Sequence, residues 1–128
     1  MYQKLTIIGN LGNDPDARYT DGSGDSMVCN FNIATNRVYY KDNKKEKDTV
    51  WFGVSAWGKL AEICNEHLSK GDLVQVEGIM RPPNIWNTDE GEPRCNLEMK
   101  ADKVLFLKLS GNNDSGGNQV SPDDDDFI

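Results

Sequence analysis

Two of the three tryptophans lie six positions apart in the segment WFGVSAW, residues 51–57. Side chains of alternate residues in a β-strand lie on opposite faces, so Trp51 and Trp57 would share one face with Gly53 and Ser55. The other face would carry Val50, Phe52, Val54 and Ala56. Indoles about 20 Å apart, with small side chains between them, could stack with flat rings. The spacing fits equally well with indoles packed under a loop, under a tail or in a subunit interface.

Further aromatic and basic side chains surround this segment. Trp86 is expected at the mouth of a later loop, and Tyr39 and Tyr40 open a polar segment with four lysines, residues 39–48. The basic residues interleaved with these rings are Arg37, Lys41, Lys44, Lys45, Lys47, Lys59 and Arg81. Together they indicate a locally positive groove. For Lys44 and Lys45 taken singly, a solvated hairpin tip is the simpler interpretation.

The overall charge argues in the other direction. The 128 residues carry a formal net charge of −7, whereas nucleic-acid-binding domains are usually basic. The excess is concentrated at the end of the chain, because five of the 21 acidic residues and none of the 14 Lys and Arg lie in residues 111–128. Residues 1–110 are therefore close to neutral, and a positive groove on them is compatible with the composition.

The periodicity predicts the elements that position these side chains. Strands are expected over residues 4–9, 26–35, 49–57 and 73–78, with the arms of a further hairpin over residues 79–86 and 95–109. Residues 39–48 are expected to form an exposed hairpin loop. Between the third and fourth strands, Leu60, Ile63, Cys64, His67 and Leu68 recur at helical spacing, which predicts a helix over residues 59–69.

This order predicts an all-β fold, the OB-fold, which is a five-stranded Greek-key barrel with one helix between strands three and four. Other small barrels with one helix have a similar order. The domain is expected over residues 1–110. Residues 111–122 lack core-forming side chains and predict a flexible linker, and residues 123–128 form the acidic tip of a disordered C-terminal tail.

Several classes of protein are disfavoured by the sequence. No apolar run approaches the roughly 20 residues of a membrane-spanning helix, and the start of the chain does not resemble a secretory signal. Three widely spaced cysteines indicate a reducing cytoplasm rather than a disulfide framework. Cys64 and His67 lack the further ligands of a zinc site and are interpreted as packing residues. No metal or other cofactor is expected.

An enzymatic function is also disfavoured. The chain has one histidine, no nucleophile-elbow motif and no phosphate-binding glycine loop. Some OB barrels are nucleases, and Asp14, Asp16 or Glu77 would be the candidate metal ligands in that case. The Asp14-Pro15 pair is explained more simply by a turn.

Four stretches of the sequence resemble bacterial-type single-stranded DNA-binding proteins, of the kind that chromosomes, phages or plasmids encode. They are IIGNLGNDPDARYT, NFNIATNR, WFGVSAWGKLAEICNEHLSKGDLVQVEG and the acidic, aromatic C-terminus. The resemblance covers residues 3–109 and the tip. It implies an OB-fold that binds and protects single-stranded DNA, without sequence dependence, during replication, recombination and repair.

The resemblance also implies roles for individual residues. The base-stacking positions of the family match Trp51, Trp57, Trp86, and Tyr39 or Tyr40. Its contacts with the DNA backbone match Arg18, Arg37, Lys59, Lys70 and Arg81. Its partner-binding tip matches Asp123, Asp124, Asp125, Asp126, Phe127 and Ile128. The family forms homotetramers through strand one and sheet surfaces, acts in the cytoplasm at the nucleoid or in the host of a phage, and recruits replication, repair and recombination proteins.

The sequence departs from the family at three places. The tip ends in Asp-Phe-Ile instead of the usual Asp-Ile-Pro-Phe, the segment Pro82-Pro83-Asn84 replaces basic residues, and the linker is short. The net acidity of the chain favours a second interpretation, a protein-interaction adaptor built on an OB-fold, with little DNA binding of its own. Quenching of tryptophan fluorescence by single-stranded DNA at several salt concentrations distinguishes the two.

Overall fold

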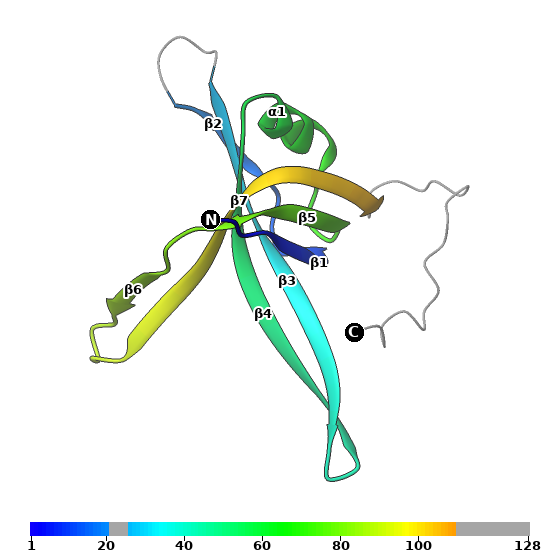
Figure 1. Ribbon diagram of the computed structural model, residues 1–128, viewed down its shortest axis with the longest axis vertical. Helices are drawn as coiled ribbons and strands as arrows, with labels where there is room; N and C mark the ends of the chain where they lie inside the picture. Colours follow the sequence, from blue (N-terminus) through cyan, green and yellow to red (C-terminus); the bar gives the residue numbers. More distant parts are fainter. Residues whose placement is uncertain (21–25, 110–128) are drawn as a thin grey trace.

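The computed structural model describes residues 1–20 and 26–109, which form seven strands and one helix (Figure 1). The elements are β1 (Leu5–Leu11), β2 (Asp16–Tyr19), β3 (Met27–Lys41), β4 (Lys44–Trp57), α1 (Gly58–His67), β5 (Leu73–Met80), β6 (Asn84–Asn87) and β7 (Pro93–Lys108). The predicted linker and the acidic tip, Asp123 to Ile128, lie outside the described residues.

Five of the strands close into a barrel in the order β1-β5-β7-β4-β3. The β4–β7 pair is parallel, and the other pairs are antiparallel. The barrel is closed by pairing between β1 and β3 at Asn10↔Ala34 and Leu11↔Ile33. This closed barrel, with its single helix before β5, confirms the predicted OB-fold. β2 and β6 are short additions that pair with β3 and β7.

Two glycines permit the tight crossings of the barrel. A Cβ atom on Gly9 would overlap the backbone carbonyl of Ala34 on β3, and one on Gly78 would overlap the carbonyl of Lys100 on β7. In both places one strand lies directly against the backbone of another. Any larger side chain would force these strands apart, so the path of the chain requires glycine there.

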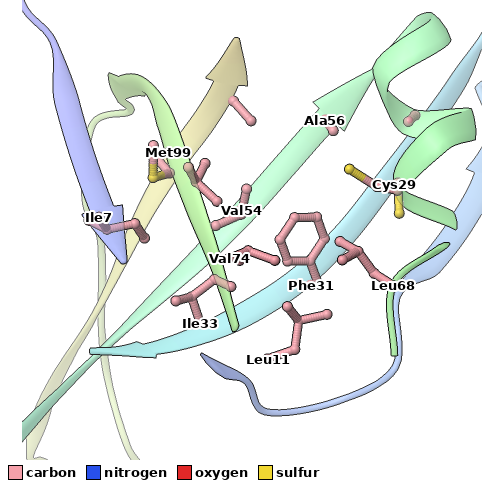
Figure 2. Packing of buried hydrophobic residues seen from close by; sticks show 14 residues of the cluster. Ile7, Leu11, Cys29, Phe31, Ile33, Val54, Ala56, Leu68, Val74 and Met99 are labelled. Atoms are coloured by element: carbon pink, nitrogen blue, oxygen red, sulfur yellow. The ribbon is translucent and has the colours of Figure 1, made fainter. Parts of the chain in front are cut away.

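The core follows from the alternation of β3 and β4 (Figure 2). Its buried residues are Ile7, Leu11, Cys29, Phe31, Ile33, Val54, Ala56, Ala61, Cys64, Leu68, Val74, Val76, Met99 and Ala101. Within the barrel, Phe31 and Ile33 of β3 point inward, and Phe52, Val54 and Ala56 of β4 do so as predicted. Val50 was also predicted to point inward, but β4 has already left the barrel at that point and the Val50 side chain is 40% exposed.

The helix packs on the barrel through a narrower stripe than predicted. α1 begins at Gly58 and ends at His67, so the prediction of residues 59–69 is correct to within two residues. Ala61, Cys64 and Leu68 are buried, whereas Ile63 is 38% exposed. The side chain of His67 is half-exposed, and its ring lies 6.0 Å from that of Phe106. The packing interpretation therefore holds for Cys64, but His67 lies at the margin of the contact.

Residues 39–48 form the predicted exposed hairpin, but the prediction that they are a loop was wrong, because most of them are paired in strands. β3 and β4 continue as a long hairpin that projects from the barrel (Figure 1), and only Asp42 and Asn43 form the turn. Both turn residues have positive φ, 54° and 66°, as a two-residue turn matched to the strand twist requires. β5 also extends through Ile79 and Met80, which were assigned to the next hairpin.

The three cysteines differ in their environment. Cys29 and Cys64 are fully buried, whereas Cys95 is exposed on β7. Burial raises the pKa of Cys29 to about 11 and that of Cys64 to about 12, because the thiolate loses its hydration. We expect a water-soluble thiol reagent at pH 8 to label Cys95 alone until denaturant is added. Peptide mass mapping checks this, and fast labelling of Cys29 or Cys64 would contradict the packing.

The described residues contain no helix long and apolar enough to cross a membrane. Within the same part of the chain, no group of three or more His, Cys, Asp or Glu side chains is arranged to hold a metal ion.

Candidate nucleic-acid interface

The outer face of β3 and β4 carries the two tryptophans. The register pairs Ala34 with Trp51 and Val28 with Trp57, so both indoles lie on the same side of the sheet. Trp51 is 54% exposed and Trp57 is 41% exposed. The predicted alternation is thus confirmed, and the described residues do not bury either ring. One of the alternatives for this segment, packing under a described loop, is met only in part, because about half of each side chain stays exposed.

Polar side chains cover the sheet between the two indoles. One row across the strands joins Asn32, Gly53 and Glu98, and the next joins Asn30, Ser55 and Lys100. The Ser55 hydroxyl donates to Oδ1 of Asn30 at 2.8 Å. We refer to these six residues as the polar floor. A ligand lying between the indoles would meet amide, hydroxyl, carboxylate and ammonium groups rather than apolar surface.

The loop after β1 supports Trp51. A Cβ atom on Gly12 would overlap the indole of Trp51, with Cη2 only 2.8 Å away, so the six-membered ring lies directly against the backbone of Gly12. The Gly12 amide donates to the Asn32 carbonyl at 2.9 Å, and Oδ1 of Asn13 accepts from the Asn32 amide at 3.0 Å. The sequence GNLGNDP therefore positions the first indole from one side.

The same surface continues along the β3–β4 hairpin. Tyr40 on β3 pairs with Lys45 on β4, and Val38 pairs with Lys47, in phase with Ala34 and Trp51. Residues Asn36, Val38, Lys45, Glu46 and Lys47 line an open hollow of about 430 Å³. The opposite surface of the hairpin carries Arg37, Tyr39, Lys41, Lys44, Glu46 and Asp48.

The two candidate tyrosines are thereby separated. Tyr40 is 70% exposed and lies on the surface of Trp51. Tyr39 lies on the other surface, where the Arg37 guanidinium lies 5.1 Å from the centre of its ring. The structure thus brings Tyr40 together with the tryptophans but places Tyr39 and Arg37 behind the hairpin.

The third tryptophan, Trp86, lies where the surface of Trp51 and Trp57 continues onto the β6–β7 hairpin. Trp86 on β6 pairs with Arg94 on β7, and Arg94 is in phase with Glu98 and Lys100 of the polar floor. Trp86 is 42% exposed. The β6–β7 hairpin projects from the barrel beside the longer β3–β4 hairpin (Figure 1). All three tryptophans and Tyr40 therefore belong to one continuous set of outward positions, which we call the aromatic face.

The aromatic face is basic although the chain is acidic. Its charged members on β2, β3, β4 and β7 are the cations Arg18, Lys45, Lys47, Arg94 and Lys100 and the carboxylates of Asp16 and Glu98. Five cations against two carboxylates leave a surplus of three positive charges, and the ion pair of Arg94 with Glu92 at 3.3 Å reduces it to two, in contrast to the net −7 of the whole chain. Such a surface can attract a polyanion.

The remaining basic candidates are scattered. Arg18 lies on the aromatic face opposite Val28, but its guanidinium is paired with Asp16 at 3.1 Å. The Arg81 amide donates to the Glu98 carbonyl at 2.8 Å, which places Arg81 at the margin of the polar floor. Lys59 is on α1, and the Lys70 amide donates to Asp14 Oδ1 at 2.8 Å in the loop before β5. Lys59 and Lys70 are outside the aromatic face.

A model of the single-strand binding protein family matches residues 2–107. The chain belongs to this family. It is 39% identical over 117 residues to single-stranded DNA-binding protein 2 of Chlorobaculum tepidum, which covers 88% of this chain and 78% of that protein. It is 39% identical over 130 residues to single-stranded DNA-binding protein 1 of Xylella fastidiosa strain 9a5c, covering 97% and 94%.

Solved structures of single-strand binding proteins have the same fold. The Plasmodium falciparum protein in complex with single-stranded DNA superimposes with a TM-score of 0.70 at 25% identity, covering 84% of this chain and 97% of that one. The small single-stranded DNA-binding protein of Streptomyces coelicolor superimposes with a TM-score of 0.66 at 22% identity, covering 81% and 93%. The latter supports the barrel alone.

Several side chains of this single-strand binding protein were not among the predicted site residues. They are Asn30, Asn32, Ser55, Arg94, Glu98 and Lys100. Lys45 and Lys47 were predicted only as members of a larger basic set, and the phase of Trp51, extended backwards through β4 to the Asp42-Asn43 turn, could have separated them from Lys44. The residues on β7 have no such signal, because the β4–β7 pairing joins segments that are distant in the sequence.

Proposed function

We propose that this chain binds and protects single-stranded DNA without sequence dependence, with the aromatic face as its binding surface. The observation that carries the proposal is the pair of exposed indoles, Trp51 and Trp57, on either side of the polar floor. Bases stacked on such rings gain about 1–3 kcal/mol each whatever their sequence. The cations of the hairpins would neutralise phosphates along the path. Duplex DNA would bind poorly, because its bases are already stacked on one another.

The proposed action is binding rather than catalysis, in the cytoplasm during replication, recombination and repair. Family membership supports this setting. The acidic tip, Asp123 to Ile128, is proposed to recruit partner proteins in these processes, on the strength of its resemblance to the family tip.

Titration with an oligo(dT) tests the binding function directly. We expect strong quenching of tryptophan fluorescence, because bases stack on exposed indoles, and an affinity that falls with salt as counterions are released. An adaptor with little DNA binding would show neither effect. Metal-dependent cleavage of labelled DNA in Mg²⁺ would contradict the proposal that the chain does not act as an enzyme.

The lysines of the hairpin allow a matched comparison. Lys47 is on the aromatic face, whereas Lys44 is on the opposite surface of the same hairpin. We expect Lys47→Ala to lower the slope of log affinity against log salt by about 0.7, the value for one phosphate contact on a single strand. Lys44→Ala, with the same loss of charge, should leave the slope nearly unchanged. Equal slopes for the two variants would show that the hairpin acts only through its total charge.

We also propose that the chain assembles as a homotetramer. On the side facing β3, β1 is paired only at Asn10 and Leu11, so its first residues present a free edge. Exposed edges of this kind invite pairing with another chain. Ile8 on β1 is 50% exposed, and Leu105 and Leu107 on β7 are 39% and 40% exposed. Sedimentation equilibrium tests the assembly, and a monomer at micromolar concentration would contradict it.

A further inference from the structure

The loop after β1 is joined to β3 by one backbone hydrogen bond and one side-chain hydrogen bond. The pairing of β1 with β3 ends at Leu11↔Ile33, and the same register places Gly12 opposite Asn32. In a regular antiparallel ladder, two residues in such a position exchange both hydrogen bonds through their backbones. Here the Gly12 amide donates to the Asn32 carbonyl at 2.9 Å, but the Asn32 amide donates to Oδ1 of Asn13 at 3.0 Å. The side-chain oxygen of Asn13 thus takes the place of the Gly12 carbonyl.

The backbone held in this way is the one that supports Trp51. A Cβ atom on Gly12 would overlap Cζ3 of the indole and lie 2.8 Å from Cη2, so the ring and the Gly12 backbone are in contact. After Gly12 the chain turns towards the loop before β5, where Asp14 Oδ1 accepts from the Lys70 amide at 2.8 Å. Nδ2 of Asn13 donates to the Asp14 carbonyl at 2.9 Å. Asn13 therefore secures Gly12 to β3 at the point where the chain turns away from that strand.

A ring that is oriented before binding stacks on a base at a lower entropic cost. An exposed side chain can occupy several staggered rotamers, and immobilising it on binding lowers the affinity. Trp51 is 54% exposed, but its contact with Gly12 limits the positions that the ring can take. Asn13 can therefore affect the binding surface through Gly12, without contacting the DNA itself.

We propose that Asn13 is a positioning residue for DNA binding, which holds Gly12 against Trp51 so that the indole is oriented before a base stacks on it. The inference rests on the proposed function, since it concerns a ring on which a base would stack. It predicts that the contribution of Asn13 to the affinity depends on Trp51 and is independent of Trp57.

A double-mutant cycle tests this dependence. Asn13→Ala is made in the unaltered chain, in Trp51→Ala and in Trp57→Ala, and the Kd for a labelled oligo(dT) is measured for each by anisotropy. We expect Asn13→Ala to raise Kd about 2- to 10-fold in the unaltered chain and in Trp57→Ala, the range for immobilising one side chain on binding. In Trp51→Ala it should leave Kd unchanged, because the coupling between two residues disappears when one of them is absent.

Gln3→Ala is the matched control for Asn13→Ala. Oε1 of Gln3 accepts from the Met80 amide at 3.1 Å, so this substitution removes a bond of the same kind, from a side-chain oxygen to a strand amide. Gln3 is not part of the aromatic face, and its loss should leave Kd unchanged. Thermal unfolding verifies that both variants are folded.

A second measurement follows the indole without DNA. The chain has three tryptophans, so replacing Trp57 and Trp86 with phenylalanine leaves Trp51 as the only one. In this background Asn13→Ala should increase the quenching of tryptophan fluorescence by acrylamide and lower its anisotropy, since the ring becomes more accessible and more mobile. Gln3→Ala should change neither quantity.

Gly12→Ala provides a second route to the same result. Its methyl group would displace the ring instead of releasing it, so it should raise Kd in the unaltered chain but not in Trp51→Ala. Equal increases of Kd for Asn13→Ala in Trp51→Ala and in Trp57→Ala, or unchanged acrylamide quenching, would overturn the inference while leaving the proposed function intact. Failure of the unaltered chain to bind oligo(dT) would instead overturn the proposed function.

Discussion

Replacing Trp51 with alanine is expected to weaken the binding of single-stranded DNA by about 1–3 kcal/mol, or roughly 5- to 150-fold. The indole is more than half exposed and lies on the aromatic face, so its loss removes a stacking surface without opening a cavity in the core. Trp57→Ala should have an effect of similar size for the same reason. Fluorescence or anisotropy titration with an oligo(dT) measures the loss, and thermal unfolding verifies that the barrel is intact.

Tyr19 provides the matched control for this experiment. Its side chain is 58% exposed, close to the value for Trp51, but its register with Met27 puts it out of phase with the aromatic face. Tyr19→Ala should leave the affinity within about twofold, in keeping with the small effects of most exposed substitutions. If Tyr19→Ala weakened binding as much as Trp51→Ala, the aromatic face would not be the binding surface. If Trp51→Ala unfolded the chain, the indole would be a packing residue.

Gly9→Ala is expected to have the largest effect on stability. The new methyl group would overlap the Ala34 carbonyl where β1 closes the barrel, and backbone cannot move aside as a side chain can. We expect a cost of about 3 kcal/mol or more, a large share of the roughly 5–15 kcal/mol that stabilises a domain. The melting temperature should fall by more than about 10 °C. In Gly78→Ala the new methyl group would overlap the Lys100 carbonyl, so this substitution should lower the stability by a similar amount.

Gly53→Ala is the control for these two substitutions. Its Cβ atom would make only ordinary contacts, the nearest at 3.6 Å to the Glu98 side chain. The free energy of unfolding should therefore change little, and urea denaturation of the three variants side by side makes the comparison. Equal stability of Gly9→Ala and Gly53→Ala would show that the strands do not cross as closely as described.

The barrel could be predicted from the sequence because its strands have one polar, solvent-facing side and one apolar, buried side. Phe31 and Ile33 on β3 alternate with Asn30 and Asn32, and Val54 on β4 alternates with its small polar neighbours. The distal half of the β3–β4 hairpin has no buried side. Both of its surfaces carry polar side chains, so the sequence there has the pattern of a loop. The only local signal there was the Asp42-Asn43 pair, which suits a two-residue turn.

The candidate site was predicted only in part. Trp51, Trp57 and Trp86 were identified by residue type and spacing, and the structure places all three on the aromatic face. The net charge was misleading, because the aspartates of the tail dominate a total that says nothing of where Lys47 and Lys100 lie. The choice between Tyr39 and Tyr40 depended on register, which was not accessible until the hairpin was known to be regular.

β1 and β3 are joined by only two residue pairs, whereas β3 and β4 share fourteen. We call this junction between β1 and β3 the seam, and it is the weakest junction of the barrel. Short junctions open most often, and their amides exchange with solvent first. Gly12, which supports the Trp51 ring, follows immediately after the seam. A strand stacked on Trp51 would therefore favour the closed seam, and by linkage it would slow exchange of the Gly12 amide, which donates to the Asn32 carbonyl of β3. The exchange rate of backbone amide protons at the seam would then show whether a strand is bound to Trp51, although these protons do not contact the DNA.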